Sequence, residues 1–184
     1  ASVTFTDAVI VDYRNNAWKL NPTGPLAGDG TGTDGVVFSD PRTTAPEEVG
    51  GDVRLASFNV LNYFTTLGNE NPSCVAHTDR FGDGVTVREG CDQRGAWDAD
   101  DLQRQQDKIV AAINALDADV VGLMEIENSA ALGEQADEAT ATLVAALNAA
   151  AGADTWAFVP SSTDLPPASE QDVITNAIIY RTAA

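Results

Sequence analysis

The sequence predicts an α/β domain, because apolar segments of strand length alternate with segments of helical period. Residues 53–60 and 119–128 are apolar and short, and an amphipathic segment separates them. With 184 residues, of which 43% are hydrophobic, the chain is long enough to bury one substantial core. We expect strands at 53–60, 119–128, 155–160 and 172–181, and helices at 101–116 and 137–150.

Residues 1–52 differ from this pattern. Residues 1–20 alternate loosely and predict two short strands around residues 14–16. Residues 21–52 are dominated by Pro, Gly, Thr and Asp, which is typical of a linker or a long surface excursion. We therefore predict residues 1–52 to be N-terminal strands and a linker from a preceding region, and residues 53–184 to be the main domain.

One segment of the linker, "DGTGTDG" at residues 29–35, superficially resembles a calcium-binding loop. It lacks the glycine at the sixth position and the bidentate glutamate at the twelfth that such loops require. No ion is expected there.

The first predicted strand belongs to "VRLASFNVLNYFTTLG", residues 53–68, and places Asn59 where its pattern requires a hydrophobic residue. A second amide follows at Asn62. A buried amide without partners costs about 1–3 kcal/mol. Protein groups, water or a bound molecule must therefore satisfy these side chains, and both become candidate site residues.

Residues 61–99 are predicted to form a long loop that holds both cysteines, Cys74 and Cys91. We expect a disulfide between them, which would stabilise the fold by about 3 kcal/mol and indicate a compartment outside the cytosol. Two free thiols are the alternative. The chain has no CxxC motif and one histidine, His77, so a zinc site is not expected and His77 is interpreted as a loop residue.

The predicted helix at 101–116 carries its apolar residues on one face: Leu102, Ile109, Val110, Ile113 and Leu116. Asp100, with Gln103 three residues later, resembles an N-terminal capping box. Arg104 and Lys108 are interpreted as part of the solvated face.

The two strands that flank this helix should be parallel, because a strand, helix, strand crossover is right-handed and parallel in nearly all cases. Their C-terminal ends then bring Asn59 and Glu125 to one edge of the sheet, beside Glu127 and Asn128. Carboxylate and amide oxygens are ligands that Mg²⁺ or Ca²⁺ prefers. In the alternative interpretation Glu125 caps a loop and Asn59 braces a turn.

Several motifs resemble the N-terminal half of secreted bacterial nucleases of the endonuclease/exonuclease/phosphatase superfamily, to which pancreatic-type deoxyribonuclease belongs. They are "ASFNVLNYFTTLG", "RGA", "QRQQDKIVAAINALDADVVGLMEIEN" and "AIIYR", in this order. The resemblance covers roughly residues 50–181, and residues 9–23 resemble the segment that precedes the nuclease domain in such proteins.

The resemblance implies half of a four-layer αββα sandwich, with a mixed β-sheet and outer helices, and metal-dependent hydrolysis of DNA or RNA. It places a phosphate-positioning role on Asn59 and the binding of Mg²⁺, or of Ca²⁺ or Mn²⁺, on Glu125. Asn62 and Arg94 are candidate substrate-binding residues, since a guanidinium suits phosphate geometry. An exposed loop arginine is the other interpretation of Arg94, and Glu127 receives no role.

The superfamily's "NHF", "GDxN" and "SDH" motifs, which supply the general base and acid, do not occur in the sequence. The resemblance therefore implies half of an enzyme, inactive alone, with one apolar sheet face that the missing half or a dimer partner covers.

The chain has 10 basic and 28 acidic residues and a net charge of −18, which repels polyanions unless cations mediate the contact. No run of about 18 apolar residues suggests a membrane span. The chain starts at Ala1 without a charged or apolar leader, so we expect that any signal peptide has already been removed. The expected disulfide and the resemblance to secreted nucleases are the reasons to expect a secreted protein.

Two other functions remain open at this point. The chain is either part of a superfamily phosphoesterase for lipid or inositol phosphates, or a catalytically inert secreted binding module.

Overall fold

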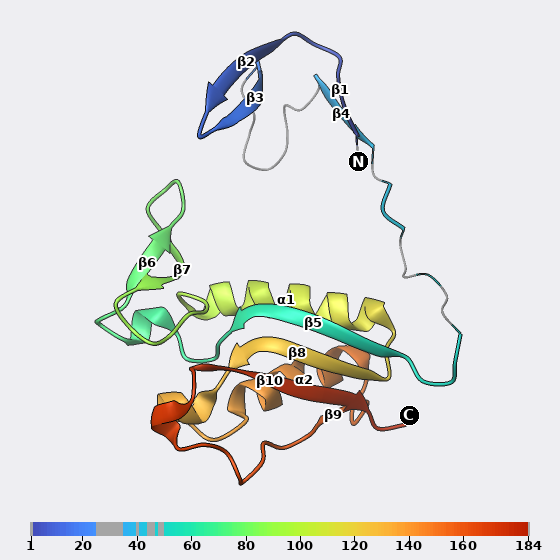
Figure 1. Ribbon diagram of the computed structural model, residues 1–184, viewed down its shortest axis with the longest axis vertical. Coiled ribbons are helices and arrows are strands. Elements are labelled where there is room, and N and C mark those ends of the chain that lie inside the picture. The colour runs from blue at the N-terminus through green and yellow to red at the C-terminus, as the bar shows by residue number, and fades with distance from the viewer. Residues whose placement is uncertain (1, 25–34, 40, 44–46, 48–49, 184) are drawn as a thin grey trace. The chain divides into compact units, whose positions relative to one another are not determined.

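Two compact units, Ala1–Pro46 and Glu47–Ala184, make up the chain in a computed structural model that describes residues 2–24, 35–39, 41–43, 47 and 50–183 (Figure 1). The division lies inside the segment that the sequence predicts as a linker. Residues 29–34 of the calcium-like segment at 29–35 lie outside the described residues.

The first unit is built from two antiparallel strand pairs, β1 with β4 and β2 with β3. The strands are β1 (Ser2–Phe5), β2 (Val9–Arg14), β3 (Ala17–Pro22) and β4 (Val36–Ser39). Asn15 and Asn16, with φ of 53° and 57°, form the turn between β2 and β3. Two consecutive positive φ values match the two-residue turn that suits the twist of a hairpin, and this hairpin confirms the two predicted strands.

The second unit contains a mixed four-stranded sheet of order β5-β8-β10-β9. Its strands are β5 (Leu55–Tyr63), β8 (Val120–Glu127), β9 (Trp156–Phe158) and β10 (Ile174–Arg181). β5 and β8 are parallel, as the crossover argument predicts, and the other two pairings are antiparallel. The described chain is thus a mixed α and β protein.

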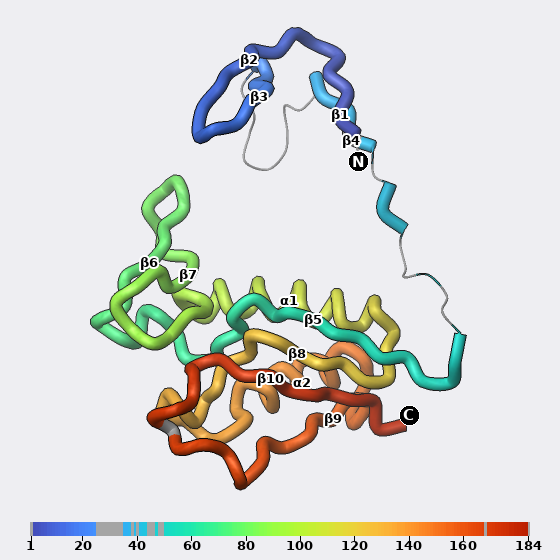
Figure 2. Tube along the Cα trace, viewed as in Figure 1, coloured from blue at the N-terminus to red at the C-terminus, as the bar shows by residue number. Residues whose placement is uncertain are grey.

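Both helices of this unit, α1 (Ala99–Leu116) and α2 (Glu138–Ala151), cover the same face of the sheet (Figures 1 and 2). α1 packs against β5, and α2 packs against β8 and β9. The core lies between helices and sheet and includes Tyr63, Ile113, Val121, Leu123, Ile126, Leu143, Leu147 and Ile179.

The opposite face of the sheet carries apolar side chains that remain exposed. Side chains alternate along a strand, so the neighbours of buried Val121 and Ile179 point to this face. Leu55 and Tyr180 are both register partners of Val120, so the three side chains form one row across this face. The exposed fractions of Leu55 and Tyr180 are 72% and 37%. Ile178, one row further along, is 48% exposed. No element of the described residues in this unit covers these side chains.

The prediction of one long loop at 61–99 is wrong, because β5 extends to Tyr63 and the segment contains a hairpin. The hairpin consists of β6 (Val75–Thr78) and β7 (Gly84–Glu89), and a 3-10 turn at Gly68–Glu70 precedes it. Both strands are short and surrounded by Gly, Asp and Asn, which hid their alternation. Cys74 precedes β6 and Cys91 follows β7, and the predicted disulfide joins them across the open end of the hairpin.

The predicted capping residue of α1 is also wrong. The helix begins at Ala99, and the side chain of Asp98, not of Asp100, accepts a hydrogen bond from the Asp101 N–H at 3.0 Å. Asp100 and Asp101 lie in the first turn, where negative charge interacts favourably with the helix dipole. Three aspartates in four residues made the cap position ambiguous in the sequence.

Candidate functional site

The parallel pairing of β5 and β8 brings Asn59 and Glu125 together at the C-terminal edge of both strands. Asn59 Nδ2 donates a hydrogen bond to Glu125 Oε1 at 2.7 Å, which defines the Asn59–Glu125 pair. Asn59 is exposed and Glu125 is half-buried. The structure thus contains the juxtaposition that the crossover argument predicts.

The backbone at this edge adopts conformations that its residues do not favour. Glu125 has φ of 60°, and Leu61 and Asn62 have φ of 53° each. The register shifts at the same level, between Asn59 and Tyr63 in the β5–β8 pairing. A non-glycine residue with positive φ costs about 1–3 kcal/mol, and such strain, like bulges, gathers at functional sites.

Hydrogen bonds from within the protein hold this strained segment. Asn59 Oδ1 accepts the Leu61 N–H at 2.8 Å. Gln105, which projects from α1, donates through Nε2 to three successive carbonyl oxygens, of Val60 (3.2 Å), Leu61 (2.9 Å) and Asn62 (3.4 Å). Both ends of the Asn59 amide are therefore satisfied by protein groups.

Glu125 retains one oxygen for a ligand. Its Oε1 accepts from Asn59, whereas within the part of the chain that the structure describes Oε2 has no hydrogen-bond partner. Asn59 thereby fixes the orientation of a carboxylate whose other oxygen is available.

Glu127 has a different environment, although it lies two residues further along β8. It is 1% exposed, and its carboxylate accepts hydrogen bonds from Thr65 Oγ1, Thr66 N, Thr66 Oγ1 and Ser129 Oγ at 2.6–3.1 Å. Burial, and secondarily the charge of Glu127, raises the pKa of Tyr63 far above its ordinary value. Glu127 therefore acts as a brace between the ends of β5 and β8, with no oxygen left for a ligand.

Asn62 and Arg94 do not contact the Asn59–Glu125 pair directly, but they share a groove with Asn59. The groove has a volume of about 820 Å³ and lies between β5, β7 and α1. Arg94 Nη2 forms an ion pair with Asp172 at 2.9 Å, and both side chains are exposed. His77 lies exposed on β6 and does not line the groove.

The donors at this edge could contribute to a magnesium site only if other ligands completed it. Among the described residues, no three His, Cys, Asp or Glu side chains come close enough to form a metal cluster. Mg²⁺ is commonly held by one or two carboxylates together with substrate phosphates and water, so a single carboxylate with an available oxygen suits it. Glu125 is the residue that offers one.

Sequence reasoning missed Gln105, the residue that holds the strained segment of β5. The signal was present, because Gln105 and Gln106 fall between Leu102 and Ile109 on the apolar face of the helix. A polar residue on such a face must find a buried partner. Gln106 finds the Tyr63 hydroxyl, which donates to its Oε1 at 2.6 Å.

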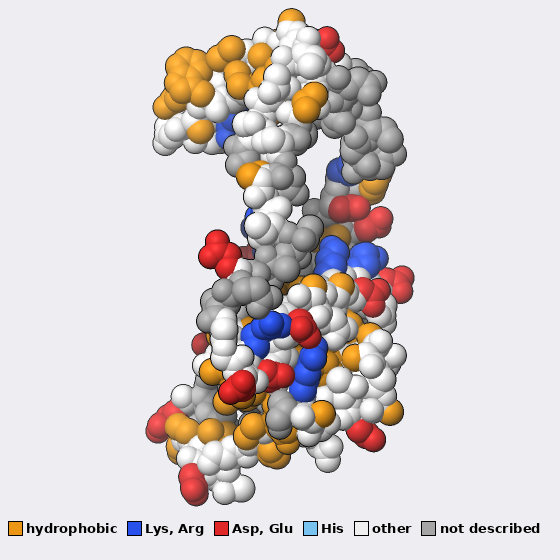
Figure 3. Space-filling view, turned by 90° about the vertical axis from the view of Figure 1, so that its right-hand side faces the viewer, with side chains coloured by type: hydrophobic (Ala, Val, Ile, Leu, Met, Phe, Trp, Pro, Cys, Tyr) orange, Lys and Arg blue, Asp and Glu red, His pale blue; other side chains and the backbone are white. Residues whose placement is uncertain are grey.

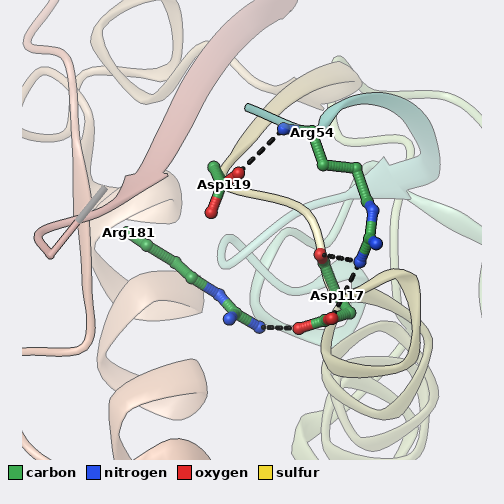
Figure 4. A network of polar contacts seen from close by, with 4 residues as sticks. All are labelled: Arg54, Asp117, Asp119 and Arg181. Carbon is green, nitrogen blue, oxygen red and sulfur yellow. Dashed lines mark hydrogen bonds and ion pairs between the residues drawn. The ribbon is translucent and has the colours of Figure 1, made fainter. Parts of the chain in front are cut away.

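A second polar network, also missed, lies at the opposite end of the sheet, where β5 and β8 begin (Figure 4). Arg54 Nη1 donates to Asp117 O and Oδ2 at 2.8 Å each, and Arg181 Nη2 lies 2.9 Å from Asp117 Oδ1. The Arg54 N–H donates to Asp119 Oδ2 at 2.8 Å. On the side of the molecule that Figure 3 shows, basic and acidic side chains accordingly intermingle.

This network joins the end of α1 to β5 and β10. The hydrogen bond from Arg54, followed by the charge of Arg181, lowers the pKa of Asp117 below its ordinary value. Asp117 also ends α1 in the left-handed conformation, with φ of 48°. The contacts indicate a structural clamp.

Comparison of the chain with known protein families, with curated proteins and with solved structures found no match. None of the helices in the described part of the chain has the length and apolarity needed to span a bilayer.

Proposed function

We propose that this chain is the N-terminal half of a secreted, metal-dependent nuclease domain that hydrolyses phosphodiester bonds in nucleic acids. The observation that carries the proposal is the Asn59–Glu125 pair, held on strained backbone at the C-terminal edge of two parallel strands. The resemblance of the motifs around both residues to secreted nucleases of the endonuclease/exonuclease/phosphatase superfamily supports the same assignment.

Each residue of the pair has a distinct role in this proposal. Glu125 would hold Mg²⁺, or Ca²⁺ or Mn²⁺ in its place, through Oε2. When bound, such an ion stabilises negative charge on the phosphate and lowers the pKa of a bound water. Asn59 keeps the carboxylate in place and has a second amide hydrogen on Nδ2 for a phosphate oxygen.

The general base and acid for the attack of water would come from the complementary half of the domain. Within the described residues His77 lies on β6, outside the groove that Asn59 lines. The exposed apolar sheet face, with Leu55, Ile178 and Tyr180, supports a four-layer sandwich in which that half, or a second copy of the chain, covers it.

Secretion is part of the proposal, and the Cys74–Cys91 disulfide supports it, because disulfides persist mainly in oxidising compartments.

A catalytically inert secreted binding module is the second candidate. The observation that favours it is that protein groups satisfy both ends of the Asn59 amide, as in a purely structural brace. Nothing in the geometry favours lipid or inositol phosphates over nucleic acid.

The substitution Glu125→Gln separates the two candidates. We expect it to lower magnesium-dependent DNA hydrolysis by the complete protein about 100-fold or more. Binding of Mn²⁺ to the chain, followed by electron paramagnetic resonance, should weaken in parallel. Glu134→Gln, at an exposed position after β8, is the matched control. Full hydrolysis and unchanged Mn²⁺ binding in the Glu125 variant would rule out the metal assignment.

A further inference from the structure

The groove between β5, β7 and α1 concentrates positive charge in a strongly acidic chain. The whole chain carries 10 basic residues against 28 acidic ones, yet Arg94, Arg104 and Lys108 line this one groove, and Asp101 is the acidic residue among its lining. The volume of about 820 Å³ lies within the range of about 300–1,000 Å³ that is typical of ligand sites.

Two of the three cations form ion pairs within the described part of the chain, and the third does not. Arg104 forms an ion pair with Asp101, whose side chain is 6% exposed, so one end of this pair is anchored in the protein. Arg94 pairs with exposed Asp172. Lys108 is exposed and has no ion pair with any described residue. The Arg94–Asp172 pair is exposed on both sides and contributes at most about 1 kcal/mol, so Arg94 can turn toward an anionic ligand at low cost. Arg104 keeps its contact with buried Asp101, and the rest of its exposed guanidinium is available to a ligand.

The remaining residues that line the groove suit a ligand that has apolar surfaces as well as a negative charge. The apolar walls come from Phe58, Val85, Val87, Ile109 and Ala112. A nucleotide offers matching groups: a phosphate for the cations, and apolar sugar and base surfaces for the walls.

The groove continues from the candidate site, because Asn59 and Asn62 line one part of it. We propose that it binds a nucleotide that flanks the scissile phosphate of the substrate, with Arg104 and Lys108 on the backbone phosphate. This proposal rests on the proposed nuclease function. It explains how a chain of net charge −18 engages a polyanion at one place.

The test is the binding of a fluorescein-labelled single-stranded DNA of about ten nucleotides, followed by fluorescence anisotropy with all divalent metal chelated. We expect Lys108→Gln and Arg104→Gln each to weaken binding about 3- to 10-fold. The slope of log affinity against log salt should fall by about 0.7 for each cation removed. Arg88→Gln, on β7 but outside the groove and paired with Glu89, should change affinity less than about 2-fold.

The proposal is overturned if the unmodified chain does not bind the oligonucleotide, or if the Lys108 and Arg88 variants bind equally well. Circular dichroism of each variant establishes that it is folded. Chelation separates this result from catalysis, because binding is measured without the metal that the proposed hydrolysis needs. If the Glu125 variant of the complete protein still hydrolyses DNA but Lys108→Gln loses binding, the metal assignment fails and the groove stands.

Discussion

Glu125 combines an available carboxylate oxygen with a backbone conformation that glutamate disfavours, and the two properties have one structural origin. The pairing of β8 with β10 shifts register between Leu123 and Ile126 of β8, and within this bulge Glu125 has φ of 60° and its side chain contacts Asn59 on the neighbouring strand. Asn59 and Met124 are paired in register, so their side chains lie on the same face of the sheet. In a regular strand Glu125, the next residue, would point to the opposite face. The strain is therefore the structural requirement for forming the pair.

This reasoning predicts an inverted preference between alanine and glycine at position 125. In an ordinary strand glycine is less stable than alanine by about 0.5–1 kcal/mol. At positive φ the order should reverse, so Glu125→Gly should exceed Glu125→Ala in free energy of unfolding by about 1 kcal/mol. Urea unfolding of both variants measures the difference. Ala56→Gly, earlier in the paired part of β5, is the control and should be destabilising.

At the scale of elements, the predictions succeeded where a segment was long and periodic. α1, β8 and β10 lie close to their predicted ranges, and the end of α2 at Gly152 follows from the positive φ of 113° that glycine accepts. The β6–β7 hairpin was missed because four- and six-residue strands give too few alternations to stand out from the surrounding Gly and Asp residues.

The clamp around Asp117 is an element-scale device, because it fastens α1 to β5 and β10, and it predicts a pH dependence. The pKa of Asp117 is lowered in the folded state, so its charged form stabilises the fold at any pH above the unfolded value of 3.8. This stability should disappear as the pH falls below 3.8 through the folded pKa. Asp117→Asn should therefore reduce stability at neutral pH and converge with the unmodified chain in acid.

Thermal unfolding measured from pH 7 to pH 2 tests this pH dependence. Asp92→Asn, at an exposed loop position, is the control and should follow the unmodified chain throughout. A constant difference between the Asp117 variant and the unmodified chain at every pH would contradict the clamp.

At the scale of the whole molecule, the site was predicted from the topology of the strands rather than from the local sequence around each residue. That Asn59 and Glu125 meet follows from one rule about crossovers. How they meet does not, since leucine at position 61 gives no sign of a left-handed backbone and Gln105 approaches from another element. Arg104 and Lys108 are exposed, as the solvated-face interpretation predicts, but a helical pattern does not reveal that β7 forms the opposite wall of a groove beside them.

If the chain is half of a domain, the open face of its sheet must be buried in the complete protein. Ile178 and Ile179 are adjacent on β10, but Ile178 is 48% exposed on the open face and Ile179 is fully buried under the helices. If the open face is covered only in the complete protein, Ile178→Lys should change the unfolding free energy of this chain by less than about 0.5 kcal/mol. In the complete protein the same substitution would bury an unpaired charge and should cost several kcal/mol.

Ile179→Lys is the control and should unfold both forms. Equal destabilisation of both forms by Ile178→Lys would mean that this chain already covers the face by self-association, and sedimentation velocity of the unmodified chain would then show a dimer.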